Sequence, residues 1–118
     1  MLFALNSKAE ENNIKYYSED SGILSLMYHR FDENKYPSTN IQMDIFKEQM
    51  SIINTLNYKF YDPKYLKKKF SLVKDKKKIL ITIDDAFSSF YEFAWPYLKK
   101  EKIPFILFVS TEAVGKNG

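Results

Sequence analysis

Four short apolar segments recur along the chain and predict buried β-strands. They cover residues 23–29, 58–61, 79–83 and 103–110. Each is too short for a typical helix and consists mainly of large aliphatic and aromatic residues. The segments at 79–83 and 103–110 are almost continuously apolar, which favours strands that are buried on both faces of a sheet.

Helical periodicity is found between the first two of these segments. Residues 44–56 carry large apolar side chains at spacings of three and four, as in an amphipathic helix. Asp44 is a candidate N-cap, and the alternative is an earlier capping box formed by Thr39 and Gln42. Asn57 can end the helix, because asparagine tolerates the left-handed backbone conformation.

Two further helices are predicted downstream. Asp62 followed by Pro63 is typical of a helix start, since proline needs no hydrogen-bond partner in the first turn. The second of these helices covers residues 88–100 and contains Pro96. We therefore expect a kink or a restart at that position.

Strands and helices thus alternate along the whole chain. This order predicts an α/β fold in which helices cover a mainly parallel sheet. In such folds, binding and catalytic sites gather at the carboxyl ends of the strands. His29 and Arg30 follow one predicted strand, and Asp84 and Asp85 follow another, so these four residues form the candidate site.

The pair Asp84 and Asp85 is the strongest chemical signal in this set. Adjacent carboxylates repel each other and lose solvation where they are buried, so a bound cation would stabilise them. One carboxylate can bind a metal while the other accepts a proton from water. The structural alternative is that one aspartate caps the following helix while the other makes a surface hydrogen bond.

Composition narrows the classes of function. The 118 residues are 45% hydrophobic and 28% charged, which fits one small globular domain. The net charge is +3, and the excess lies mostly in lysines within residues 64–78, where a solvated surface explains it without any partner. No nucleic-acid-binding motif accompanies these lysines, so we expect no nucleic-acid partner. Cysteine is absent, which excludes thiolate metal sites and cysteine nucleophiles.

The first residues bear on localisation. Residues 1–9 begin with a short apolar stretch and end in Ser7, Lys8 and Ala9, a small-x-small pattern that fits the remnant of a signal peptide. No apolar run reaches the roughly 20 residues of a membrane span. We therefore expect residues 10–118 to be the folded part of an exported protein of the periplasm or cell envelope. A cytoplasmic protein is the alternative.

Two blocks of the sequence resemble the polysaccharide deacetylases, the NodB-homology domain of carbohydrate esterase family four. The first block is LMYHRF followed by FKEQMSIINTLNYKFY, and the second is ILITIDDAFSSFYEFAWPYLKKEKIPFILFVS. The resemblance extends from Gly22 to Gly118, and the two separated blocks agree with the family in order and spacing. The matching residues of the second block are Thr82, Asp84, Asp85, Tyr91, Pro96, Leu98, Lys99, Ile103, Pro104, Phe108 and Val109.

The resemblance implies a fold and a chemistry. The fold would be part of a TIM-like (β/α) barrel of the seven-stranded type, with about four parallel strands. The family removes acetyl groups from N-acetylated or O-acetylated polysaccharides with a divalent metal, commonly zinc. Asp84 matches the general base and Asp85 the metal ligand. From their position after a strand, His29 and Arg30 are candidates to contact substrate or support the acid pair, and the alternative for His29 is a hydrogen-bonded histidine under the loop.

The resemblance also implies what the chain lacks. The family's His-x-x-x-His motif, which supplies two further metal ligands, has no counterpart in these 118 residues. We therefore interpret residues 10–118 as the N-terminal part of a catalytic domain that is inactive alone. The implied partners are an acetylated amino-sugar polymer, the cell envelope as a peripheral association, and a C-terminal half on another chain.

Three positions depart from the family pattern. Ile83 replaces the usual phenylalanine, which is a mild change. Ala86 replaces the usual glycine, so the tight turn beside the acids is expected to differ. Phe105 and Ile106 replace alanine and threonine, which makes the last strand bulkier.

Two other classes of function stay open. A non-catalytic α/β remnant would bind glycan or a partner chain through an exposed strand edge. A receiver-like domain would bind magnesium with the acid pair. Receivers, however, place that pair on their first strand and need a later phosphoacceptor aspartate, and no aspartate follows Asp85.

Overall fold

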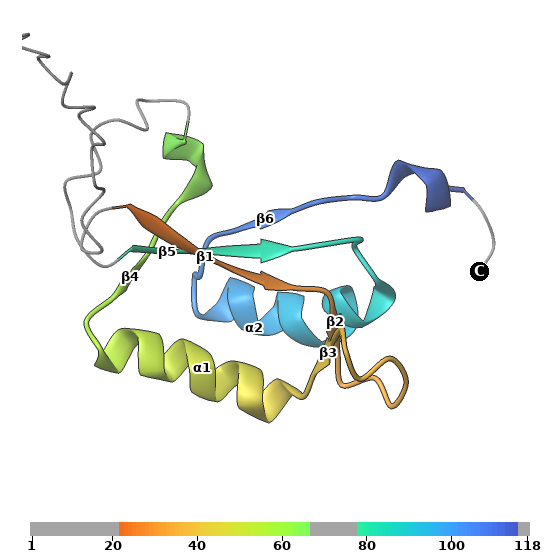
Figure 1. Ribbon diagram of the computed structural model, residues 1–118, viewed down its shortest axis with the longest axis horizontal. Coiled ribbons are helices and arrows are strands. Elements are labelled where there is room, and N and C mark those ends of the chain that lie inside the picture. The colour runs from red at the N-terminus through yellow and green to blue at the C-terminus, as the bar shows by residue number, and fades with distance from the viewer. Residues whose placement is uncertain (1–21, 67–77, 116–118) are drawn as a thin grey trace, which may run out of the picture.

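The computed structural model describes residues 22–66 and 78–115, and within these ranges the chain folds as two layers. One layer is a four-stranded parallel sheet, and the other contains the helices α1 (Met43–Thr55) and α2 (Trp95–Lys100) (Figure 1). The predicted α/β class with about four parallel strands is therefore confirmed. The predicted signal-peptide remnant at residues 1–9 lies outside the described residues.

The central strand of the sheet is β5 (Lys78–Ile83). It pairs along its whole length with β1 (Ile23–Tyr28) on one side. On its other side, β4 (Lys59–Phe60) pairs with the start of β5 and β6 (Phe105–Leu107) pairs with its end. All of these pairings are parallel, so the carboxyl ends of β1, β5 and β6 lie at the same edge of the sheet.

The sheet differs from the predicted strands in two respects. First, β6 is shorter than the apolar segment at 103–110, because the strand begins only at Phe105 and ends at Leu107, after which the N–H of Phe108 makes a last bond to β5. Second, a small parallel pair forms beyond β1, between β2 (Arg30–Phe31) and β3 (Asn40–Ile41). Both strands lie in or next to a polar stretch rich in turn-forming residues, so the sequence did not predict this pair.

Helix α1 was predicted correctly, but its capping was not. The N-cap residue is Gln42, which makes no side-chain cap bond, and Asp44 accepts only the N–H of its neighbour Ile45. The N–H of Met43 donates instead to Asp32 Oδ1 at 2.7 Å, from the loop between β2 and β3. Tertiary contact therefore caps this helix, and local sequence does not.

The other helices follow the predicted signals. Asp62 accepts the N–H of Lys64 at 3.0 Å and starts the 3₁₀ turn η1 (Pro63–Tyr65). The chain after Leu66, where this predicted helix would continue, lies outside the described residues. Near Pro96 the helix changes type instead of restarting, since a π-helical turn, η3 (Phe90–Ala94), runs directly into α2.

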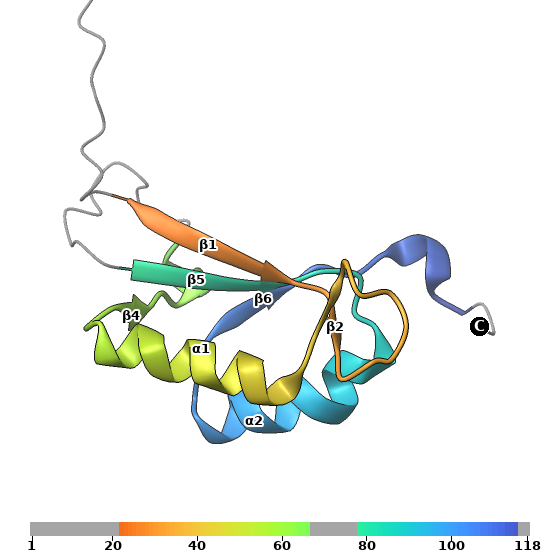
Figure 2. The ribbon, with the colours of Figure 1, turned by 60° about the horizontal axis from the view of Figure 1, so that its bottom comes forward.

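The hydrophobic core lies between the sheet and the two helices. Both α1 and α2 cover the same face of the sheet (Figure 2). On β5, Ile79, Ile81 and Ile83 point into this core, so the alternate positions Leu80 and Thr82 point to the opposite face. None of the described helices is long and apolar enough to cross a membrane.

Candidate active site at the carboxyl end of β5

Asp84 directly follows β5 and is fixed by backbone hydrogen bonds around it. Its N–H donates to the carbonyl of Tyr28 at 2.8 Å, which extends the pairing of β1 with β5 by one residue. On the opposite side of β5, the N–H of Phe108 donates to the carbonyl of Ile83 at 2.8 Å. The acid pair therefore starts from a rigid position between two neighbouring chain segments.

The two aspartates have different environments. Asp85 is exposed, whereas Asp84 is half-buried and its Oδ1 is buried without a hydrogen-bond partner among the described residues. A buried carboxylate oxygen without a donor is unfavourable unless water, a proton or a cation reaches it. No hydrogen bond between the side chain of Asp84 or Asp85 and the following helix is found among the described residues.

The turn that carries the acids is strained. Asp85 has φ of 68° and Ala86 has φ of 53°, both in the left-handed region. This region costs residues with a Cβ atom about 1–2 kcal/mol each, and glycine avoids that cost. Ala86, which replaces the family's usual glycine, therefore lies at a position where glycine would fit without strain.

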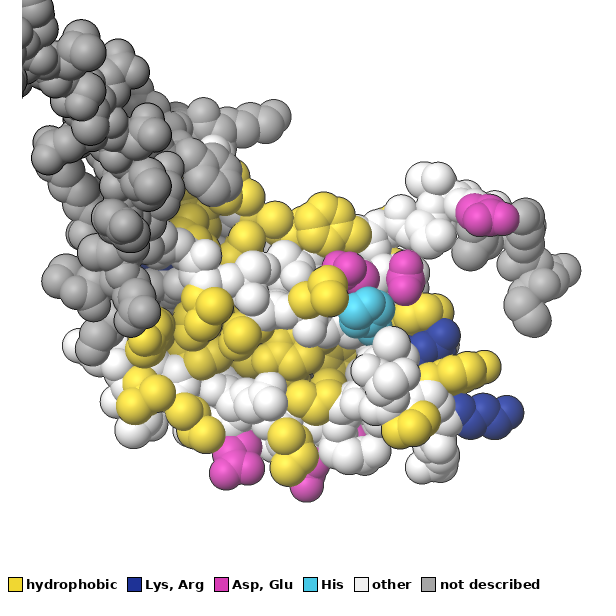
Figure 3. Space-filling model, viewed as in Figure 1, with side chains coloured by type: hydrophobic (Ala, Val, Ile, Leu, Met, Phe, Trp, Pro, Cys, Tyr) yellow, Lys and Arg dark blue, Asp and Glu magenta, His cyan; other side chains and the backbone are white. Residues whose placement is uncertain are grey.

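His29 lies at the same end of the sheet as the acid pair. It follows β1 directly and is half-buried. The space-filling view shows the chain's single histidine beside acidic side chains at this end (Figure 3). The structure thus brings His29 to the site that the strand order predicted.

Arg30 reaches the acid turn through an aromatic ring. Its guanidinium carbon lies 3.4 Å from the ring centroid of Phe87 and 4.4 Å from that of Tyr36. Nη1 of Arg30 donates to Oε2 of Glu33 at 2.8 Å. No ion pair joins Arg30 to Asp84 or Asp85 in the described part of the chain, so its present contacts are with the loop and with Phe87.

A polar network joins this loop to the acid turn, and sequence reasoning missed it. Ser89 Oγ donates to Oε1 of Glu33 at 2.7 Å and accepts the backbone N–H of Phe31 at 3.3 Å. The N–H of Glu33 donates to Oδ1 of Asn40 at 2.9 Å. The hydrogen bond from Ser89, together with Arg30, lowers the pKa of Glu33. The only signal in the sequence was a run of turn-forming polar residues.

A complete metal site is not formed by the described residues alone. Across residues 22–66 and 78–115, no group of three or more histidine, cysteine, aspartate or glutamate side chains is arranged to hold a metal ion. Zinc sites in proteins take three or four protein ligands. Asp84 and Asp85 therefore fit part of a ligand set, and the remainder would have to come from outside these ranges.

Comparison with known proteins shows which class of protein this chain resembles. No family model matches the sequence. The chain is 28% identical, over 126 aligned positions, to the poly-beta-1,6-N-acetyl-D-glucosamine N-deacetylase of Staphylococcus epidermidis. That alignment covers 94% of this chain and 44% of the relative.

Solved structures agree with this relationship. IcaB from Ammonifex degensii superposes with a TM-score of 0.72 at 30% identity, covering 83% of this chain and 42% of that one. The deacetylase PplD of Streptococcus pyogenes, solved with acetate, superposes with a TM-score of 0.63 at 27% identity, covering 77% and 43%. The chain is therefore a relative of the polysaccharide deacetylases, as predicted, and it spans less than half the length of these relatives.

Proposed function

We propose that this protein acts in a metal-dependent polysaccharide deacetylase that hydrolyses acetyl groups from an N-acetylated polymer, with O-acetyl groups as the alternative. The observation that carries the proposal is the acid pair at the end of β5, where Oδ1 of Asp84 is buried and without a hydrogen-bond partner among the described residues. The name of the S. epidermidis relative supports an N-acetylglucosamine polymer as the substrate.

Asp84 is proposed as the general base. Its backbone is held at the sheet, and its unpartnered oxygen can accept a proton from a water molecule placed beside it. That water then attacks the acetyl carbonyl carbon, the proton taken from it passes to the leaving nitrogen as the C–N bond breaks, and acetate and the free amine are released. A rigid base suits this step, because its position does not have to be organised during the reaction.

Asp85 is proposed as a ligand for a divalent metal, zinc by the family resemblance. When bound, the metal would polarise the acetyl carbonyl as a Lewis acid. Two adjacent carboxylates do not hold zinc against water as three or four ligands do. We therefore propose that the 118-residue chain is inactive alone and acts with a segment or partner chain that supplies the other ligands, at the cell envelope.

The test separates the two aspartates in an enzyme that contains the missing ligands. The chain is joined to, or mixed with, the remaining part of a relative's catalytic domain, and acetate release from β-1,6-linked N-acetylglucosamine oligomers is measured with added zinc. Asp84→Asn should lower turnover about 10²–10⁴-fold with nearly unchanged zinc affinity. Asp85→Asn should weaken zinc binding, with partial rescue at high zinc concentration.

Three outcomes would change the proposal. Loss of zinc binding in Asp84→Asn, with zinc binding retained in Asp85→Asn, would reverse the two roles. Full activity in both variants would show that the acid pair is only structural. Chelator-sensitive acetate release by the unassisted 118-residue chain would show that the acid pair needs no further ligands from elsewhere.

A further inference from the structure

Tyr36 is an exposed aromatic residue in an unusual backbone conformation. It lies in the loop between β2 and β3, has φ of 61°, and is 56% exposed. Aromatic residues rarely adopt the left-handed region, and they stay there only where the surrounding structure holds them. Here the N–H of Thr39 donates to the carbonyl of Tyr36 at 3.0 Å, and the Arg30 guanidinium covers the ring at 4.4 Å.

The ring of Tyr36 is connected to the acid turn by a continuous stack. The same guanidinium that contacts Tyr36 also lies 3.4 Å from the ring centroid of Phe87, in the turn that follows Asp85. Glu33 holds Arg30 in place by an ion pair, and Ser89 holds Glu33 by a hydrogen bond. The position of Tyr36 is therefore set by the segment that carries the acid pair.

This arrangement leaves one face of the Tyr36 ring open, on the side away from Phe87, because Arg30 lies between the two rings. Arg30 occupies one side of the Tyr36 ring, so the large exposed area lies on the other side and at the edge. A flat aromatic face packs against the C–H groups on one face of a pyranose ring, while a phenol hydroxyl can bond to sugar hydroxyls. A polysaccharide offers further sugar rings next to the one that reacts.

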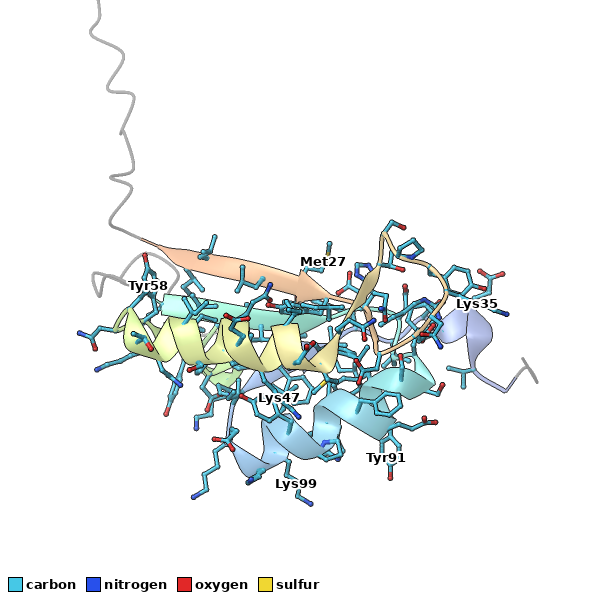
Figure 4. The ribbon with its side chains drawn as sticks, turned by 90° about the horizontal axis from the view of Figure 1, so that it is seen from below. Met27, Lys35, Lys47, Tyr58, Tyr91 and Lys99 are labelled. Carbon is cyan, nitrogen blue, oxygen red and sulfur yellow. The ribbon has the colours of Figure 1, made fainter. Side chains whose placement is uncertain are left out.

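We propose that Tyr36 is a stacking platform for a pyranose ring of the polysaccharide, further along the polymer than the ring that the acid pair serves. The proposal rests on the proposed function for its choice of ligand. Tyr91 provides a matched control, because it is also exposed, at 71%, but lies on η3. Tyr91 points away from the sheet on the helix side, whereas Lys35, the neighbour of Tyr36, lies on the loop at the carboxyl end of the strands (Figure 4).

The experiment measures binding of β-1,6-linked N-acetylglucosamine oligomers to the 118-residue chain by calorimetric titration. Tyr36→Ala should weaken binding about tenfold, in keeping with the loss of one aromatic contact. Tyr36→Asn should weaken it equally, and asparagine tolerates the left-handed conformation, so loss of folding would not explain both results. Tyr91→Ala should bind as the unsubstituted chain does, and Tyr36→Phe, which keeps the ring and loses only the hydroxyl, should weaken binding less than Tyr36→Ala.

Equal binding by Tyr36→Ala and the unsubstituted chain would overturn the platform, as would the absence of any binding by the unsubstituted chain. The proposed reaction is judged separately by acetate release from the completed enzyme. If turnover depends on Asp84 but binding does not depend on Tyr36, the proposed reaction is supported and the platform is wrong. If binding depends on Tyr36 but the completed enzyme releases no acetate, the platform is supported and the proposed reaction is wrong.

Discussion

The helix-covered core and the carboxyl end of the sheet differ in what their residues contribute: close apolar packing in the core, and strained backbone and charged groups at the carboxyl end. In the core, the rings of Tyr28 and Phe31 pack edge-on against Phe46 at centroid distances of 4.9 Å and 5.1 Å. At the carboxyl end, four of the six non-glycine residues with positive φ in the described ranges belong to the acid turn or to the loop between β2 and β3. These four residues are Asp32, Tyr36, Asp85 and Ala86.

This difference shows that the core stabilises the protein, whereas the chemically reactive groups lie at the carboxyl end of the sheet. Core side chains gain from apolar burial and close packing, and they need only ordinary strand and helix geometry. The carboxyl end contains a buried carboxylate oxygen without a partner, a strained turn and a charged network. Such unfavourable features persist where a stable scaffold holds them, and they are typical of functional sites.

The largest effect is expected in the core. Phe46→Ala removes a ring that is 0% exposed and should lower the free energy of unfolding by about 3–5 kcal/mol. Ile45→Ala on the same helix is the control, since Ile45 is 45% exposed and its loss should change stability by no more than about 0.5 kcal/mol. Urea denaturation of both variants checks this. Equal losses would show that the core is not packed as described.

A smaller loss is expected where the network ties the loop to the acid turn. Ser89→Ala removes the donor to Glu33 and the acceptor for the N–H of Phe31, and should destabilise the protein by about 1–3 kcal/mol. Ser88→Ala, at an exposed neighbouring position, should have almost no effect. The two denaturation midpoints are compared. If they coincide, the network does not contribute to stability.

A substitution in the acid turn should raise the free energy of unfolding, in contrast to the substitution in the core. Ala86→Gly relieves left-handed strain of about 1–2 kcal/mol, while the greater freedom of glycine in the unfolded chain offsets about 0.4–1 kcal/mol. A net gain of about 0.5–1 kcal/mol in the free energy of unfolding is expected. Leu80→Gly in the ordinary backbone of β5 should instead be destabilising. A loss of stability in Ala86→Gly would argue against strain at this turn.

The smallest effect is a dependence of stability on pH. The pKa of Glu33 is lowered in the folded state from its ordinary value of 4.5, first by the hydrogen bond from Ser89 and then by Arg30. Its contribution to stability is therefore present above pH 4.5 and is lost as the pH falls through the lower folded value. Since the side chain is 22% exposed, the contribution should stay below about 1 kcal/mol.

Glu33→Gln tests this contribution, because glutamine keeps the shape but does not titrate. Thermal unfolding is followed from neutral to acidic pH for both proteins. The unsubstituted chain should lose more stability below pH 4.5 than the variant does. Parallel pH profiles would show that the Glu33 network does not favour the ionised carboxylate.

Sequence patterns that extend over many residues predicted most of the scaffold. The apolar run of β5 and the helical stripe of Met43, Phe46, Met50 and Ile53 gave the correct elements, because burial imposes a period that the sequence must carry. The location of Asp84 and Asp85 at a strand end followed from the same logic. Their roles, and the zinc assigned to them, stay predictions.

Features that depend on contacts between distant segments could not be predicted from the sequence. The cap of α1 by Asp32, the stacking of Arg30 on Phe87 and the bond between Ser89 and Glu33 join residues far apart in the chain, and no local period marks such pairs. The apolar run after Leu107 likewise looked like strand but leaves the sheet. Sequence thus determined which segments form the layers and where the acids emerge. Only tertiary packing decided which loop is joined to the acid turn and which strained backbone conformation the acids adopt.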